Sequence, residues 1–115
     1  LSNRDEKKTR LRATPPAERI CDGVRYLSPC DGDHGGTWIA VNEYATGFCL
    51  LNGANVGGRD EVCASPRQSR GWLIPRIACS AGIEDALRRI AYCDPRSFAP
   101  FTLLLLEPGL PAAIA

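Results

Sequence analysis

The stretch Thr37-Trp38-Ile39-Ala40-Val41 decides the predicted fold, together with the run Phe48-Cys49-Leu50-Leu51 that follows it. The first is rich in β-branched and aromatic residues and comes after two glycines, which is typical of a strand that follows a turn. The polar segment 42–47 leads to the second run, which ends at Asn52-Gly53. Two short apolar runs with a polar connection predict a β-hairpin.

Two helical patterns and a last strand follow. Ser69 is placed to cap a first helix, which Pro75 should shorten or kink. A second helix is predicted to start at Ser80, with a buried face at helical spacing formed by Ile83, Ala86, Leu87, Ile90 and Ala91. The apolar run 101–106 between proline-containing turns predicts a strand covered on both faces. This order predicts an α+β fold, with a mostly antiparallel sheet and two packed helices.

Two segments lack such patterns. The first twenty residues are polar and end in Thr14-Pro15-Pro16, which predicts a strand end followed by an exposed loop. Residues 52–68 combine glycine, asparagine, proline and charge without periodicity, which predicts a long loop. Loops of that kind often carry function.

Length, composition and charge exclude several classes of protein. With 115 residues, 44% of them hydrophobic, the chain can form one modest core but not two domains. The net charge of +1 provides no field for a nucleic-acid partner. The most apolar run, 101–106, is far shorter than the roughly 20 residues that cross a bilayer, so we expect no membrane span. The sequence has no methionine, and we expect it to be a piece of a longer protein.

The six cysteines have irregular spacings and form no C-x-x-C pair. This favours reduced thiols and a cytoplasmic location, although an even number of cysteines is also compatible with disulfides. Cys30 and His34, the only histidine, are spaced as a pair of metal ligands, but no complete zinc pattern surrounds them. We therefore predict no metal site and no cofactor.

Three local patterns offer chemistry, and each has a purely structural alternative. The tetrapeptide 3–6 places carboxylates beside a guanidinium, yet most charged tetrapeptides are simply surface. The block 35–38 lets the backbone approach another group closely, although a tight turn before a strand explains paired glycines more simply. Asn52 at a strand end can donate to an oxyanion, but an Asn-Gly pair is more often a turn.

In their order along the chain these patterns resemble the NRDE family, the family of the transport and Golgi organisation protein. The resemblance rests on Ser2-Asn3-Arg4-Asp5-Glu6, Ala13 to Ala17, residues 35–42, Leu51-Asn52, Ser69-Arg70-Gly71 and Phe101-Thr102-Leu103-Leu104. Members of that family are longer, begin with Met-Cys, and are similar to N-terminal-nucleophile hydrolases, which have an αββα sandwich. The resemblance implies that residues 1–115 are a single partial domain, the N-terminal half without its first strand.

The resemblance also implies a mechanism. In the related choloylglycine hydrolase and penicillin V acylase group, an N-terminal Cys thiolate attacks an amide carbonyl, and its own α-amino group is the base. By position, Asp5 resembles the aspartate that holds this amino group, and Asn52 the residue that stabilises the oxyanion. Arg4 stands in for a substrate-side arginine that would fall on Ser2. The implied catalytic residues are Asp5, Asn52 and Arg4, and the implied substrate-binding residues are Asn3, Trp38 and Asn42, with a turn role as the alternative for Asn42.

The implied function is hydrolysis of a small amide by an N-terminal cysteine that this sequence lacks, since position 1 is Leu. We therefore expect residues 1–115 to be inactive by themselves. The alternative is a non-enzymatic protein of haem trafficking or secretory-pathway organisation that binds a small-molecule ligand, haem included, through Cys30 or His34. Because half a sandwich leaves one sheet face open, we also expect self-association.

Overall fold

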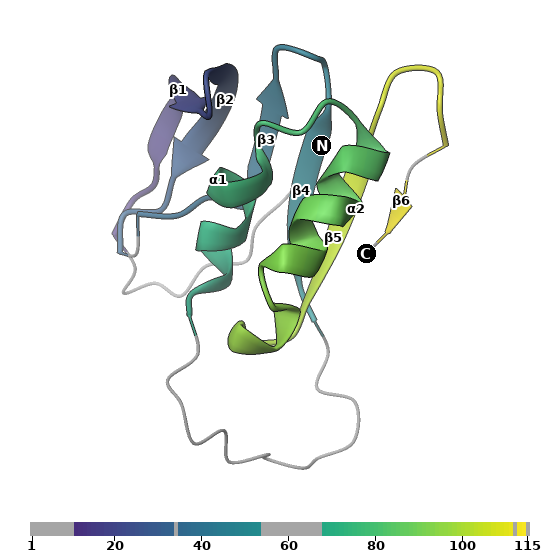
Figure 1. Ribbon diagram of the computed structural model, residues 1–115. Coiled ribbons are helices and arrows are strands. Elements are labelled where there is room, and N and C mark those ends of the chain that lie inside the picture. The colour runs from purple at the N-terminus through teal and green to yellow at the C-terminus, as the bar shows by residue number, and fades with distance from the viewer. Residues whose placement is uncertain (1–10, 34, 54–67, 112, 115) are drawn as a thin grey trace.

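The computed structural model describes residues 11–33, 35–53, 68–111 and 113–114. Its sheet has six strands, all paired antiparallel, which lie side by side in their order along the sequence (Figure 1). The strands are β1 Thr14–Cys21, β2 Val24–Cys30, β3 Ile39–Asn42, β4 Gly47–Asn52, β5 Phe101–Leu106 and β6 Ala113–Ile114. The helical segments, all between β4 and β5, are η1 Arg70–Trp72, α1 Leu73–Ile77, α2 Ile83–Tyr92 and η2 Pro95–Ser97.

Both α-helices lie on the same side of the sheet (Figure 1). Side chains alternate between the two faces of a strand, so every second residue of the central strands meets the helices. The resulting core contains Tyr26, Ala40, Phe48, Leu73, Ile74, Ile77, Ala86, Ile90, Leu103 and Leu105. The α+β fold is confirmed, and the predicted hairpin is β3–β4, in which Ile39 lies opposite Cys49.

The first hairpin, β1–β2, differs from the sequence prediction. Its strands are joined by Asp22-Gly23, whose φ values of 45° and 79° are both positive, as a type I′ turn requires. The expected exposed loop at residues 14–20 is therefore wrong. Pro15 and Pro16 lie at the edge of the sheet, where the register shifts between Thr14 and Ala17. An edge strand tolerates prolines because one side of its backbone needs no ladder partner.

The first helical segment is short, as Pro75 predicted, and α1 has only five residues after the single turn η1. Ser69 is at the N-cap position of η1, as predicted, but its side chain makes no capping hydrogen bond. The segment is nevertheless the centre of the core, since Leu73, Ile74 and Ile77 are fully buried. Burial, and not a capped N-terminus, stabilises this helix.

The second helix, α2, starts at Ile83 and not at Ser80. The Ser80 hydroxyl donates back to the carbonyl of Ile77, while the Ile83 N–H donates to Glu107 Oε2 at 2.9 Å. Glu107 thus supplies the negative charge that a helix N-terminus favours. The predicted buried face is only half right: Ala86 and Ile90 are buried, whereas Leu87 and Ala91 are exposed, because the described part of the chain places no further layer over them.

The face of the sheet away from the helices carries an apolar row. Leu27 pairs with Val41, Val41 with Gly47, and Gly47 with Leu106, so these positions cross four strands in one line. The side chains of Leu27, Val41 and Leu106 are 49%, 43% and 45% exposed. The prediction that the strand at 101–106 is covered on both faces is therefore right for one face only. We call Leu27, Val41 and Leu106 the open-face row.

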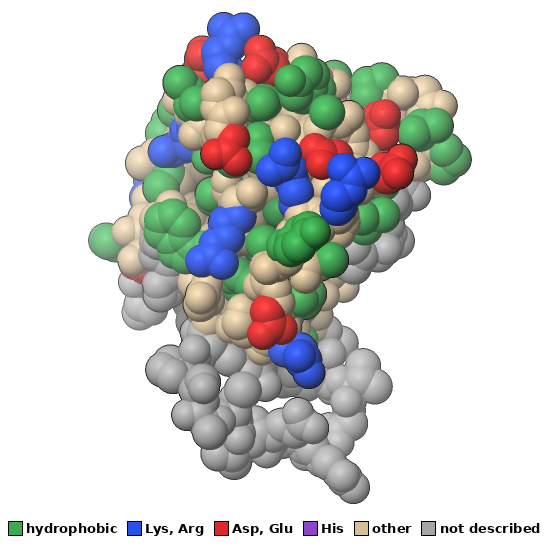
Figure 2. Space-filling model, viewed as in Figure 1, with side chains coloured by type: hydrophobic (Ala, Val, Ile, Leu, Met, Phe, Trp, Pro, Cys, Tyr) green, Lys and Arg blue, Asp and Glu red, His purple; other side chains and the backbone are tan. Residues whose placement is uncertain are grey.

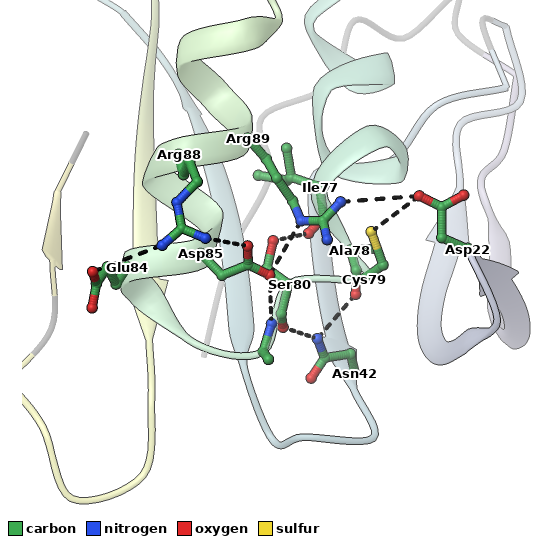
Figure 3. A network of polar contacts seen from close by, with 11 residues as sticks. Asp22, Asn42, Ile77, Ala78, Cys79, Ser80, Glu84, Asp85, Arg88 and Arg89 are labelled. Carbon is green, nitrogen blue, oxygen red and sulfur yellow. Dashed lines mark hydrogen bonds and ion pairs between the residues drawn. The ribbon is translucent and has the colours of Figure 1, made fainter.

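One side chain, Asn42, ties the helices to the sheet (Figure 3). Its Nδ2 donates to the carbonyls of Ala78 and Ser80, at 3.0 and 2.7 Å, in the segment between α1 and α2. Its Oδ1 accepts the N–H groups of Tyr44 and Thr46, both at 3.0 Å, in the turn between β3 and β4. Asn42 is only 6% exposed. Both halves of its amide are thus satisfied inside the protein.

We expect Asn42→Ala to lower the free energy of unfolding by about 3 kcal/mol, because four hydrogen bonds are lost and two buried carbonyls lose a partner. Urea unfolding of the purified chain measures the change. Asn52→Ala is the matched control, since the same side chain is exposed there and its loss should cost less than about 0.5 kcal/mol. Equal losses in the two variants would contradict the role of Asn42.

Candidate functional site

Three of the sequence motifs meet at one end of the sheet. The block 35–38 leads into β3, Asn52-Gly53 closes β4, and Arg70-Gly71 opens η1. The N–H of Leu50 donates to the carbonyl of Trp38 at 2.8 Å, which sets the first two segments side by side. The N–H of Thr37 donates to the carbonyl of Gly71 at 2.9 Å, which adds the third. We call these three segments together the motif end.

Gly36 and Gly71 pack backbone against backbone at the motif end. A Cβ on Gly36 would lie 2.5 Å from the carbonyl carbon of Gly71, closer than real atoms approach. The paired glycines therefore do permit a close approach, and the group approached is the protein's own chain. They also form a turn, since Gly35 has φ of 73° and its N–H donates to the carbonyl of Asp31 at 2.9 Å.

Asn52 lies at the end of β4, on the same face of the sheet as Phe48 and Leu50, and its side chain is exposed. With the described residues its amide makes no hydrogen bond. Trp38 is half-buried and lies on the same face, two residues before the buried Ala40. The structure thus brings together one predicted oxyanion residue and one predicted substrate-binding residue.

Arg70 is a further functional candidate that the sequence reasoning did not select. Its Nη1 donates to the carbonyl of Pro100 at 2.7 Å, and the N–H of Gly53 donates to the same carbonyl at 3.0 Å. The guanidinium is therefore held next to the end of β4, and among the described residues its other N–H donors make no hydrogen bond. The Ser-Arg-Gly motif was the available signal, but sequence spacing alone did not show that it meets Asn52-Gly53.

The other predicted site residues are not at the motif end. Asn42 ends β3 and lies at the end of the sheet opposite the motif end. At roughly 3.3 Å per strand residue, the length of β4 places it about 20 Å from Asn52. Its amide is already used by the four hydrogen bonds described above, which agrees with its alternative role as a turn residue. The candidates Asn3, Arg4 and Asp5 lie outside the described residues, as does His34.

The buried thiol of Cys79 is not activated as a nucleophile. Burial, followed by a hydrogen bond with Cys21, raises the pKa of Cys79 to about 11. A thiol with such a pKa is protonated at neutral pH and is a poor nucleophile. The five described cysteines form no disulfide with one another.

A broad depression of about 650 Å³ lies at the start of α2, where Gly82, Leu87, Glu107 and Leu110 are among the lining residues. Charged side chains of both signs gather over this face of the molecule (Figure 2). The carboxylate of Glu107 already occupies the helix N-terminus there. None of the motif residues lines the depression, so the motif end remains the better candidate.

The chain matches one known family over almost its whole length. Residues 1–111 fit the family model described as Transport and Golgi organisation 2. The matched range includes the motif end and the tetrapeptide at 3–6. No curated protein matches the chain significantly. Among the described residues, no helix is long and apolar enough to span a membrane.

We expect Gly36→Ala to destabilise the protein by about 3 kcal/mol, because the added methyl group must push Gly71 away. Gly71→Ala is the matched control: its Cβ would lie 3.2 Å from Gly36 Cα, so a small shift suffices and the cost should be about 1 kcal/mol. Both changes affect the unfolded chain alike. Thermal unfolding compares them, and a Gly36→Ala variant as stable as Gly71→Ala would disprove the close packing.

Proposed function

Because the chain belongs to the Transport and Golgi organisation 2 family, we propose that its motif end binds the carbonyl group of a small amide and that the full protein hydrolyses that amide. The attacking group would be an N-terminal cysteine thiol, as in the related cysteine hydrolases. Asp5 holds the amino group of that cysteine, and Arg4 and Asn3 contact the substrate. This chain then provides the residues around the reacting carbonyl.

The observation that carries the proposal is the exposed amide of Asn52, whose neighbour Gly53 shares one backbone acceptor with the guanidinium of Arg70. That acceptor is the carbonyl of Pro100, to which both Gly53 N–H and Arg70 Nη1 donate. An amide N–H₂ at a strand end can donate to a developing oxyanion. A guanidinium beside it suits a carboxylate on the same substrate, through paired N–H donors. The half-buried indole of Trp38 supplies an apolar surface on the same side of the sheet.

An N-acyl amino acid is a suitable probe, since it carries both an amide carbonyl and a carboxylate. We expect N-acetylalanine to bind the chain, and Asn52→Ala and Arg70→Ala each to raise the Kd at least about tenfold, which equals roughly 1.4 kcal/mol. Calorimetric titration measures the affinity. Tyr44→Ala, an exposed residue at the opposite end of the sheet, is the control and should leave the Kd unchanged.

Absence of binding, or binding that Asn52→Ala does not weaken, would refute the amide site. The second candidate function is non-enzymatic transport of a ligand such as haem. It draws support from Cys30, whose half-buried thiol donates to the carbonyl of Gly35 at 3.3 Å, next to the motif end. A haem absorbance change that Cys30→Ser abolishes, without any amide binding, would favour this second function.

The open-face row supports a two-layer sheet arrangement of the αββα kind. Apolar side chains in one line across β2, β3 and β5 are typical of a sheet face that packs against another sheet. The described residues leave this face open, and a second copy of the chain offers an equally apolar face to cover it. We infer that the open-face row then mediates self-association.

We expect the purified chain to be larger than a monomer in light scattering. Val41→Lys combined with Leu106→Lys should shift it to a monomer, because charges in the row oppose sheet-to-sheet packing. Tyr92→Lys is the control, since Tyr92 is 87% exposed and lies on α2, on the helical side of the molecule. A monomeric wild-type chain, or a double variant that still associates, would contradict the inference.

A further inference from the structure

Three metal-binding side chains meet at the end of the sheet opposite the motif end. Cys21 is the last residue of β1, Asp22 begins the turn after it, and Cys79 follows α1. The two sulfur atoms and a carboxylate oxygen all lie within 4.8 Å of one another. Cys79 Sγ is 3.8 Å from Asp22 Oδ2 (Figure 3). More than fifty residues of sequence separate the two cysteines, so only the fold brings them together.

Both sides of this cluster are held in place by the backbone. The type I′ turn fixes Asp22, and Cys21 pairs with Val24 at the end of the β1–β2 ladder. The neighbours of Cys79 on each side, Ala78 and Ser80, are the residues whose carbonyls accept from Asn42. The three donors therefore need little conformational ordering to bind a ligand, and such pre-organisation favours binding.

The distances suit a tetrahedral thiolate site. Zinc–sulfur bonds of about 2.3 Å place the donor atoms of a tetrahedron about 3.8 Å apart. Donors within 4.8 Å reach this separation through movements of about 1 Å or less, which side-chain rotation provides. Two thiolates with one carboxylate also select zinc-type cations, because calcium and magnesium prefer oxygen ligands.

The surroundings of the cluster divide it into a closed and an open side. Cys79 is 4% exposed and Cys21 is half-buried, whereas Asp22 is exposed. Arg89 Nη1 lies 3.9 Å from Asp22 Oδ2 and its Nε lies 3.2 Å from Asp85 Oδ2. Two thiolates, one carboxylate and a divalent cation carry a net charge of −1, which the guanidinium of Arg89 is placed to offset.

We propose that Cys21, Asp22 and Cys79 bind one thiophilic divalent cation of the zinc type, with a water molecule in the fourth position on the exposed side. On binding, each thiol gives up its proton to solvent, and the cation forms two bonds to sulfur and one to oxygen. Displacing these protons from a buried position lowers the affinity, but the fixed geometry opposes that loss. The site pins the β1–β2 hairpin to the helical layer and is independent of the function proposed for the motif end.

Cadmium is the probe, because its bonds to thiolates absorb in the ultraviolet. The full chain, kept reduced with a phosphine that binds metals weakly, is titrated with Cd²⁺. We expect one equivalent to bind, with the absorbance of two thiolate bonds, and the melting temperature to rise with free cadmium concentration. Cys21→Ser should lower the thiolate absorbance by at least about half and weaken binding, and Asp22→Asn should weaken binding at least about tenfold.

Cys93→Ser is the control, since Cys93 is a half-buried free thiol at the far end of α2 and should leave binding unchanged. Cys79→Ser changes a buried residue, so Cys21→Ser and the exposed Asp22→Asn carry the test if that variant fails to fold. The proposal is overturned if the reduced chain binds no cadmium, or if Cys21→Ser binds it as tightly as wild type. Rapid formation of a Cys21–Cys79 disulfide in air that bound cadmium does not slow would also overturn it.

Discussion

The buried amide of Asn42 is the constraint on which much of the molecule depends. Donors and acceptors buried in a protein must find partners, and an asparagine has both on one rigid group. Here the oxygen closes the turn between β3 and β4, and the nitrogen holds the carbonyls of Ala78 and Ser80. The same group therefore sets the strand hairpin, the bend between α1 and α2, and the height of the helices over the sheet. Cys79 and the start of α2 take their positions from that bend.

Local sequence patterns predicted the strands in which one such pattern dominates. Two short apolar runs with a polar connection marked the β3–β4 hairpin, and the apolar run at 101–106 coincides with β5. The β1–β2 hairpin was missed because its strand contains Pro15 and Pro16, although Asp22-Gly23 is the turn signal that should have counted for more. The start of α2 was misplaced because Glu107, which accepts the hydrogen bond from the Ile83 N–H, comes after the helix in the sequence. Such a long-range contact is invisible to a local pattern.

The candidate site was predictable only in pieces. The family motifs identified Trp38 and Asn52, and the structure places both at the motif end. The motifs did not show that Gly36 contacts Gly71, because that contact depends on how η1 packs against the segment before β3. They made both Asn42 and Asn52 site candidates. Each residue ends a short strand, and the antiparallel direction of β3 and β4 places the two at opposite ends of the sheet. The cluster of Cys21, Asp22 and Cys79 matches no metal-binding sequence motif, because Cys79 is far from the other two residues in the sequence.

The strand order has a consequence for how the chain folds. Neighbouring strands in the sheet are neighbours in sequence, and most are joined by short turns, but β4 and β5 pair across residues 53–100. Closing that loop, about twelve times longer than the β3–β4 connection, costs about 2 kcal/mol more in chain entropy. The helices that bury the core lie inside this loop, so the early hairpins have little to pack against until it closes. The pairing of β5 with β4 then limits the rate of folding. During synthesis the first half of the chain cannot complete its core until the second half has been made.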